Sequence, residues 1–214
     1  MTDHNVDRQT SDRLSGPPRF TAGSSLYTSY RAYQPLQPLT VQRAPQCSGG
    51  QLHGYDPRWP RIFTAEQGRI RATLGSTAIA IEHVGSSSIP GLWGRPEIDI
   101  IVGVSSSSDV DASARLLKGL GYVPHNGGAL DGEPWSVLVR PAQISFELLV
   151  VEHRGRLWNR MVYLRDQLRG SPQRALAYGR LKARWAARYG VGTPRYQQAK
   201  REFWAAIAAP GTKG

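Results

Sequence analysis

The sequence is poor in cysteine and in long hydrophobic runs. Cys47 is the only cysteine among 214 residues, so an internal disulfide is excluded and a reducing cytoplasm is the expected compartment. No apolar run approaches the ~20 residues that a membrane-spanning helix needs, and the polar start of the chain has no secretory signal. We therefore expect a soluble, cytoplasmic protein with no membrane partner.

Several catalytic motifs are also missing. The chain has no HExxH zinc motif, no paired cysteines, no GxxxxGK[ST] phosphate loop and no Ser-His-Asp order. These absences leave zinc hydrolases and P-loop ATPases without support. Of the five histidines, His83 alone lies beside the motif described below, and a single strand histidine is more often structural than catalytic.

The charge is divided unevenly along the chain. Within the formal net charge of +11, residues 153–214 carry fourteen Lys or Arg and two acids, whereas residues 1–152 carry thirteen bases and fourteen acids. Only four of the 27 bases are lysines, and the planar guanidinium of arginine suits phosphate. A basic C-terminal third fits a nucleic acid or another polyanion as partner. It fits a solvated helix surface equally well.

The hydrophobic pattern divides the chain into a tail and one domain. Residues 1–50 are rich in Pro, Gly and Ser and sustain no period of 2 or 3.6, which is typical of a disordered tail. Regular patterning begins near Tyr55. We expect a single domain over residues 51–209, followed by a flexible end over residues 210–214.

Within this domain the periods alternate between helical and extended. They predict a helix over 61–74, strands over 78–84 and 97–104, a short helix over 110–120, a hairpin of strands 135–140 and 143–151, and three helices beginning near Trp158, Pro172 and Pro194. Residues 122–134 contain Asn-Gly-Gly and Asp-Gly turn signals and are predicted to be a loop. The result is an α+β fold in which a small mixed β-sheet is covered by helices and a helical segment ends the domain.

A turn of small residues follows the first of these strands, and two acidic residues lie within the second. The turn Gly85-Ser86 comes directly after the first strand, and Glu97 and Asp99 lie two residues apart in the second, so both carboxylates face the same side. Glu147 occupies an outward position of a later strand. Small residues let backbone N–H groups approach phosphates, and carboxylates hold a divalent cation against them. Taken singly, these residues could equally be a tight turn, a backbone cap and exposed polar positions.

Two runs of residues form a recognisable signature: Ile81 to Leu92, and Arg95-Pro96-Glu97-Ile98-Asp99-Ile100. Together they resemble the signature of the GrpB family, whose fold is that of the nucleotidyltransferase superfamily. Flanking matches to the same family occur at Tyr55–Pro60, Trp158, 164–169, Tyr178, Leu181-Lys182, Tyr196 and Lys200. The resemblance covers about residues 52–208.

Three positions depart from the family pattern. Arg95 stands where the family has lysine, Glu97 where it commonly has an aliphatic residue, and Glu147-Leu148-Leu149 where relatives often have a His-x-His pair. The second acid of the superfamily's pair falls at Ile101. Asp99 is therefore the carboxylate that the resemblance supports most directly.

Two functions remain open at this point. The resemblance implies a nucleotidyltransferase that binds a nucleoside triphosphate with Mg²⁺ and passes a nucleotidyl group to an unknown acceptor. Asp99 and Glu97 would be catalytic, with Glu147 as a further metal ligand, and the phosphates would be held by Gly85, Ser86, Ser87, Arg95, Arg165, Lys182 and Lys200. The alternative is a binding module without catalysis, which takes a phosphorylated ligand, RNA or a partner protein.

Overall fold

The computed structural model describes residues 51–207. The expected tail over residues 1–50 and the flexible end over 210–214 lie outside these described residues. Within the described range, no helix combines the length and the apolar character that crossing a membrane requires.

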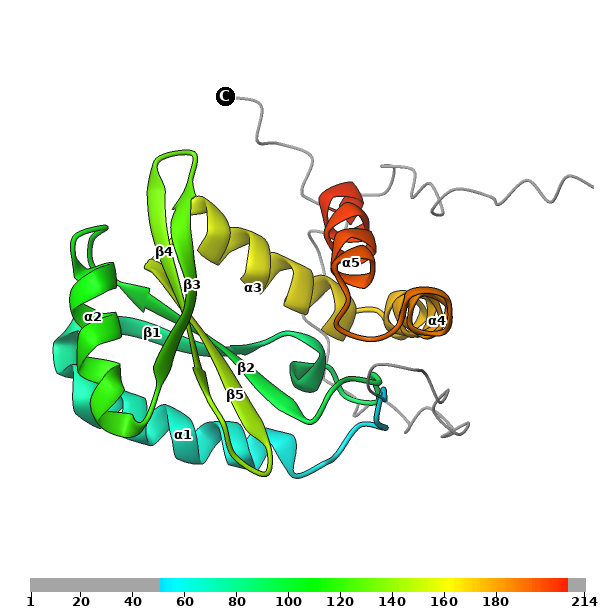
Figure 1. Cartoon of the computed structure of the whole chain (residues 1–214), viewed down its shortest axis with the longest axis horizontal. Helices are drawn as coiled ribbons and strands as arrows, with labels where there is room; N and C mark the ends of the chain where they lie inside the picture. Colours follow the sequence, from blue (N-terminus) through cyan, green and yellow to red (C-terminus); the bar gives the residue numbers. More distant parts are fainter. Residues whose placement is uncertain (1–50, 208–214) are drawn as a thin grey trace, which may run out of the picture. The chain divides into compact units, whose positions relative to one another are not determined.

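The centre of the fold is a mixed β-sheet (Figure 1). Its strands lie in the order β1-β2-β5-β4-β3, and β2 pairs in parallel with β5 while the other pairs are antiparallel. The strands are β1 (Ala78–Val84), β2 (Glu97–Val104), β3 (Val123–Leu130), β4 (Glu133–Arg140) and β5 (Ser145–Glu152). The α+β class and the mixed sheet predicted from the sequence are confirmed.

Two helices cover one face of this sheet (Figure 1). They are α1 (Trp59–Leu74) and α2 (Asp109–Leu117). The alternation predicted in β2 explains the packing, because the side chains of Ile98, Ile100, Val102 and Val104 are buried in the core that these helices share. The opposite face of β2 therefore carries Glu97 and Asp99 away from that core.

Three helices complete the domain: α3 (Arg156–Arg169), α4 (Pro172–Tyr189) and α5 (Pro194–Ile207). Trp158 of α3 packs with Ile101 and Val151 on the second face of the sheet. Ser171 caps α4 by accepting a hydrogen bond from the Arg174 backbone N–H (3.3 Å). Figure 1 shows α4 and α5 beside the end of the sheet where β2 begins, and residues of both helices line one pocket with Glu97 and Asp99.

The prediction of a loop over residues 122–134 is wrong. Most of this segment forms β3, an edge strand whose residues are nearly all exposed on both faces, so it has no hydrophobic alternation to reveal it. The Asn-Gly-Gly sequence lies inside the strand, where a Cβ added to Gly128 would stand 3.2 Å from the Trp135 ring. The turn is at Asp131-Gly132, where both residues have positive φ, as a two-residue hairpin turn requires.

A buried polar cluster joins the two layers on the side of α1. The Glu66 carboxylate accepts hydrogen bonds from the Tyr122 hydroxyl (3.0 Å) and from the Arg140 guanidinium (2.7 Å). The Arg140 guanidinium also lies 4.2 Å from the centre of the Phe146 ring. Because buried charges are costly unless they are paired, this cluster fixes α1 against β4.

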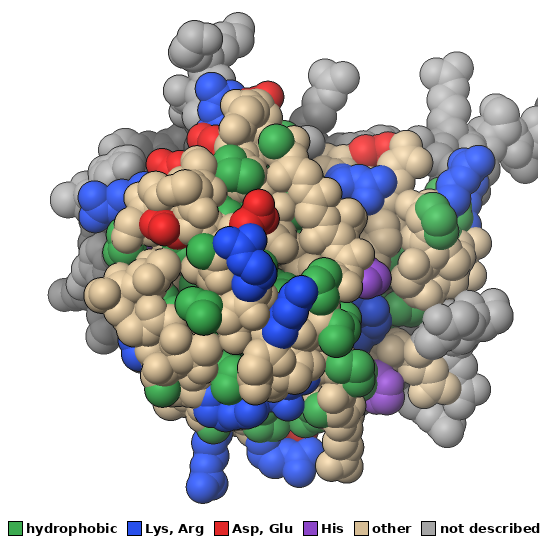
Figure 2. Space-filling model, turned by 60° about the vertical axis from the view of Figure 1, so that its left-hand side comes forward, with side chains coloured by type: hydrophobic (Ala, Val, Ile, Leu, Met, Phe, Trp, Pro, Cys, Tyr) green, Lys and Arg blue, Asp and Glu red, His purple; other side chains and the backbone are tan. Residues whose placement is uncertain are grey.

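On the surface around α2, side chains of different types are mixed. Figure 2 shows basic, acidic and hydrophobic side chains interspersed over this face. The exposed apolar residues Leu116 and Val123 are about half exposed, and isolated apolar side chains are normal on a protein surface. The convergent polar side chains lie instead on the other side of the sheet.

Candidate functional site

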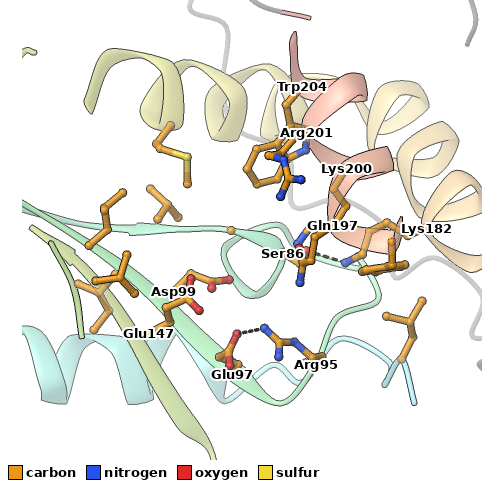
Figure 3. Close-up of a pocket in the computed structure, with 18 residues that line it drawn as sticks. Ser86, Arg95, Glu97, Asp99, Glu147, Lys182, Gln197, Lys200, Arg201 and Trp204 are labelled. Atoms are coloured by element: carbon orange, nitrogen blue, oxygen red, sulfur yellow. Dashed lines mark hydrogen bonds and ion pairs between the residues drawn. The ribbon is translucent and has the colours of Figure 1, made fainter. Parts of the chain in front are cut away.

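A cavity of about 220 Å³ lies between the outward face of the sheet and the C-terminal helices. The sheet side contributes Gly85, Ser86, Arg95, Glu97, Asp99 and Glu147. Figure 3 shows the three carboxylates on the sheet and the α5 side chains projecting toward them from the other side. Residues that are far apart in the sequence thus meet in one pocket.

The three carboxylates share one face because of strand register. In the parallel pair of β2 and β5, Asp99 lies opposite Glu147 and Glu97 lies opposite Ser145. Arg95 donates a hydrogen bond to Glu97 (2.6 Å), and the Ser145 hydroxyl adds a longer one (3.4 Å). The structure gives Asp99 and Glu147 no hydrogen bond or ion pair within the described residues. These two carboxylates are therefore available to a ligand.

The turn after β1 presses directly against Asp99. Gly85 has φ +67°, and a Cβ placed on it would stand 1.8 Å from Oδ2 of Asp99. The register explains the contact, since Val84 pairs with Asp99 in the antiparallel pair of β1 and β2. Glycine at this position lets the backbone of the turn approach the acidic cluster closely.

Burial and mutual repulsion change the acidity of this cluster. Loss of solvent raises the pKa of Asp99 to about 8, with the neighbouring Glu147 and Glu97 carboxylates adding to the rise. Burial also raises the pKa of Glu97, although Arg95 opposes the shift. Carboxylates that repel one another in a partly dry site are stabilised by an added cation.

The donor atoms fit Mg²⁺, which prefers oxygen ligands and is usually held by one or two carboxylates together with substrate phosphates and waters. Among residues 51–204, no three His, Cys, Asp or Glu side chains lie close enough to hold a metal ion as a group. The three predicted ligands Glu97, Asp99 and Glu147 thus share the pocket without forming a ready-made three-ligand site. Asp99 and Glu147, being unpaired neighbours, are the pair that suits the ion.

Of the three serines in the turn Ser86–Ser88, one faces the pocket. The Ser86 hydroxyl lines the cavity, whereas the Ser87 hydroxyl is hydrogen-bonded to Nε2 of His83 (3.0 Å) and the Ser88 hydroxyl donates to the Gly85 carbonyl (2.8 Å). The side chain of Ser87, predicted to bind phosphate, is therefore turned into the protein.

The burial that surrounds Ser87 also explains the state of His83. The His83 ring stacks on Phe63 with 4.8 Å between ring centres. Burial, together with the nearby positive charges of Arg169 and Arg165, lowers the pKa of His83 to about 3. A neutral, stacked imidazole bonded to a serine is a structural group, as the sequence suggested for a single strand histidine.

The basic residues predicted for phosphate binding separate into two groups. Arg95, Lys182 and Lys200 line the cavity. Arg165 does not, because its guanidinium donates to the carboxylates of Glu82 (2.6 Å) and Asp166 (2.8 Å). Arg165 fastens α3 to β1 and is left out of the site that we propose below.

Two lysines reach the cavity from different helices. Lys200 of α5 lies 5.8 Å from the Tyr196 ring centre and 5.5 Å from that of Trp204. Burial lowers the pKa of Lys200, and the Asp99 carboxylate opposes this shift. Lys182 of α4 is 2% exposed, and its ammonium is held by the Ser86 hydroxyl and the Trp93 carbonyl.

Sequence reasoning missed part of the helical wall. Gln197, Arg201 and Trp204 of α5 also line the cavity, and Figure 3 shows them on the same side as Lys200. They lie three residues before, one after and four after Lys200. Residues three and four apart share a helix face, so the spacing around Lys200 was a signal that could have found Gln197 and Trp204.

Comparison with known proteins shows which family the chain belongs to. The sequence model of the GrpB protein family matches residues 51–209. The chain belongs to the GrpB family. It is 30% identical over 155 residues to the glutamate-rich protein GrpB of Alkalihalophilus pseudofirmus, a match that covers 70% of this chain and 88% of that protein. It is 43% identical over 93 residues to a UPF0157 protein of Halalkalibacterium halodurans, which covers 43% of this chain and about half (48%) of the relative's length.

Solved structures show the same fold. The crystal structure of the conserved protein GrpB from Enterococcus faecalis superposes with a TM-score of 0.60 at 23% identity, covering 73% of this chain and 98% of that one. The Cid1 poly(U) polymerase, solved with Mg and 3′-dATP bound, gives a TM-score of 0.50 at 14% identity over 68% of this chain and 49% of that one. The GrpB domain of this protein thus has a nucleotidyltransferase-like fold.

Proposed function

We propose that this GrpB protein binds a nucleoside triphosphate together with Mg²⁺ and transfers the nucleotidyl group to an acceptor. The observation that carries the proposal is that Asp99 and Glu147 lie opposite each other on adjacent strands, across one pocket from Lys200. Neither carboxylate has a hydrogen bond or ion pair within the described residues. An acidic wall facing a basic wall suits a cation and a polyphosphate bound together. The nucleotidyltransferase-like fold supports the same chemistry.

The proposed roles follow from where the side chains lie. The backbone at Gly85 and the hydroxyl of Ser86 would hold phosphate oxygens, while Lys200 and Arg95 would neutralise phosphate charge. Asp99 with Glu147 would hold the ion, which when bound stabilises charge on the reacting phosphate and the pyrophosphate leaving group. Glu97, which is paired with Arg95, lies beside them.

The transfer itself is a displacement at phosphorus. An acceptor hydroxyl oxygen forms a bond to the α-phosphorus, the bond from that phosphorus to the bridging oxygen breaks, and pyrophosphate leaves. Asp99 or Glu147 would accept the acceptor's proton, because these are the two carboxylates of the described pocket that have no hydrogen bond or ion pair within the described residues. The proposed setting is the cytoplasm, in keeping with the single cysteine.

The test is calorimetric titration of the full chain with the four ribonucleoside triphosphates, each with and without Mg²⁺, and with the matching diphosphates. We expect binding of at least one triphosphate that requires Mg²⁺. The proposal fails if no triphosphate binds in the presence of Mg²⁺, or if the affinity is the same after the metal is removed by a chelator.

A second candidate, a binding module for RNA, is favoured by one surface feature. Arg180, Arg184 and Arg188 are exposed, lie four residues apart on α4 and form no ion pair within the described residues. Residues at this spacing share one helix face, and α4 contains no acid. This candidate predicts RNA binding that weakens steeply with salt and is unchanged in Asp99→Asn.

A further inference from the structure

The buried ammonium of Lys182 has an unusual set of partners. It donates hydrogen bonds to the Ser86 hydroxyl oxygen (2.6 Å) and to the Trp93 carbonyl oxygen (2.5 Å). No carboxylate pairs with it within the described residues, although the side chain is 2% exposed. Burial lowers the pKa of Lys182 well below that of a free lysine, because an ammonium removed from water without a counter-ion is costly. A role in the site is therefore a better explanation for this lysine than a contribution to stability.

The contacts of Lys182 fix the position of Ser86. The Ser86 Cβ packs against the Gly94 Cα, where an added Cβ would come within 3.2 Å of it. The segment that carries Trp93 is held in turn by paired backbone hydrogen bonds between His53 and Gly94 (2.7 and 3.0 Å). Lys182 therefore ties the turn after β1 to an anchored loop.

The direction of the Lys182 bond determines what the Ser86 hydroxyl can do. A serine hydroxyl has one hydrogen to donate and two lone pairs to accept with. Since one lone pair receives the ammonium N–H, the hydroxyl hydrogen is left for another acceptor, and the structure gives it none within the described residues. Ser86 lines the cavity, so that hydrogen is available to an oxygen of a bound ligand.

We propose that Lys182 is a positioning residue, which holds the Ser86 hydroxyl so that its hydrogen is donated to a phosphate oxygen in the pocket. This inference rests on the proposed nucleotide site and changes the role expected for Lys182, from a direct phosphate ligand to a residue that acts through Ser86. A bound phosphate also supplies nearby the negative charge that the ammonium lacks. Lys200, which reaches the cavity from α5 and forms no hydrogen bond with Ser86 within the described residues, binds the phosphates independently.

A double-mutant cycle separates the two roles. The affinity of the full chain for inorganic tripolyphosphate with Mg²⁺ is measured by calorimetry for wild type, Ser86→Ala, Lys182→Met and the double variant. A lost hydrogen bond to a charged group corresponds to about a tenfold weakening. If Lys182 acts through Ser86, each single change weakens binding about tenfold and the double variant is no weaker than Ser86→Ala, because interacting residues are not additive.

Lys200→Met is the matched control. Combined with Ser86→Ala, it should multiply the two losses to about 100-fold, as expected for groups that act separately. Circular dichroism checks that each variant is folded, and Lys182→Gln replaces Lys182→Met in the cycle if the latter does not fold.

The results distinguish this inference from the proposed function. Multiplied losses in the Ser86 and Lys182 double variant, or undiminished binding by Lys182→Met, would overturn the positioning role while leaving the phosphate site in place. Failure of the wild-type protein to bind either tripolyphosphate or any nucleoside triphosphate would overturn the proposed function and, with it, the role of Lys182.

Discussion

The carboxylate of Asp99 occupies the space that a side chain on Gly85 would need. A Cβ on Gly85 would stand 1.8 Å from Oδ2 of Asp99 and 2.6 Å from its Cβ. This contact joins the two parts of the proposed site, the turn for phosphate and the acid for the metal ion. The contact can be tested without a ligand, because a substitution at Gly85 should change the stability of the protein.

Gly85→Ala should destabilise the protein by at least ~2 kcal/mol, because it adds both a steric clash and backbone strain at positive φ. Gly132→Ala is the matched control, since Gly132 has φ +84° but nothing within 4 Å of an added Cβ. The control should cost only about 1 kcal/mol of backbone strain. Urea denaturation measures both, and equal losses would show that the Asp99 contact is unimportant.

Asp99→Asn should stabilise the ligand-free protein at pH 8. The pKa of Asp99 is raised to about 8 in the folded state, against about 3.9 in an unfolded chain. Between these values the unfolded state has lost the proton that the folded state keeps, so the contribution of Asp99 to stability falls as pH rises.

The expected gain at pH 8 is at least ~1 kcal/mol, or about 2–4 °C in Tm for a chain of this size, and it should vanish near pH 4. Asp111→Asn, a change at an exposed acid of α2, serves as the control for loss of one negative charge. Thermal melts of both variants across this pH range test the prediction. Identical melting of wild type and Asp99→Asn at pH 8 would contradict it.

Glu66→Ala should destabilise the protein by about 3–5 kcal/mol, the usual cost of removing one partner from a buried ion pair. The change leaves the Arg140 guanidinium, which is 18% exposed, without its carboxylate. Tyr122→Phe removes only the hydroxyl that donates to Glu66 and should cost about 1 kcal/mol. Chemical denaturation compares the two, and a small loss in Glu66→Ala would mean that solvent reaches Arg140.

The hydrophobic pattern of the sequence was sufficient to predict the helices and strands that have one buried face. The alternation in β2 placed Glu97 and Asp99 together because apolar side chains at every second position must face the core. The edge strand β3 could not be found in this way, since both of its faces are exposed. Its hydrogen bonds with β4, the next strand of the same hairpin, decide its conformation, and no hydrophobic period in the sequence records them.

The candidate site was predictable in its residue types more than in its contacts. The sequence suggested Asp99 and Glu147 as partners, but the parallel register of β2 and β5 that sets them opposite each other is a long-range pairing. The ion pair between Arg165 and Glu82 depends on packing between segments distant in sequence. The hydrogen bond between Ser87 and His83 depends on the conformation of a tight turn. Side-chain direction in a short turn is not encoded by composition alone.

The affinity of Asp99→Asn for a nucleoside triphosphate in the presence of Mg²⁺ tests the central claim most directly. Asn keeps the size of the side chain and removes the charge that would hold the ion, so the folded variant should bind at least about 100-fold more weakly than wild type, while Asp111→Asn binds as wild type does. The size of the effect follows from the residues that hydrogen-bond to metal ligands, whose mutation typically weakens metal binding by about 10- to 100-fold. Loss of a direct ligand should weaken it at least as much. Calorimetry showing Asp99→Asn within about twofold of wild type, with Mg²⁺ still required, would contradict the account.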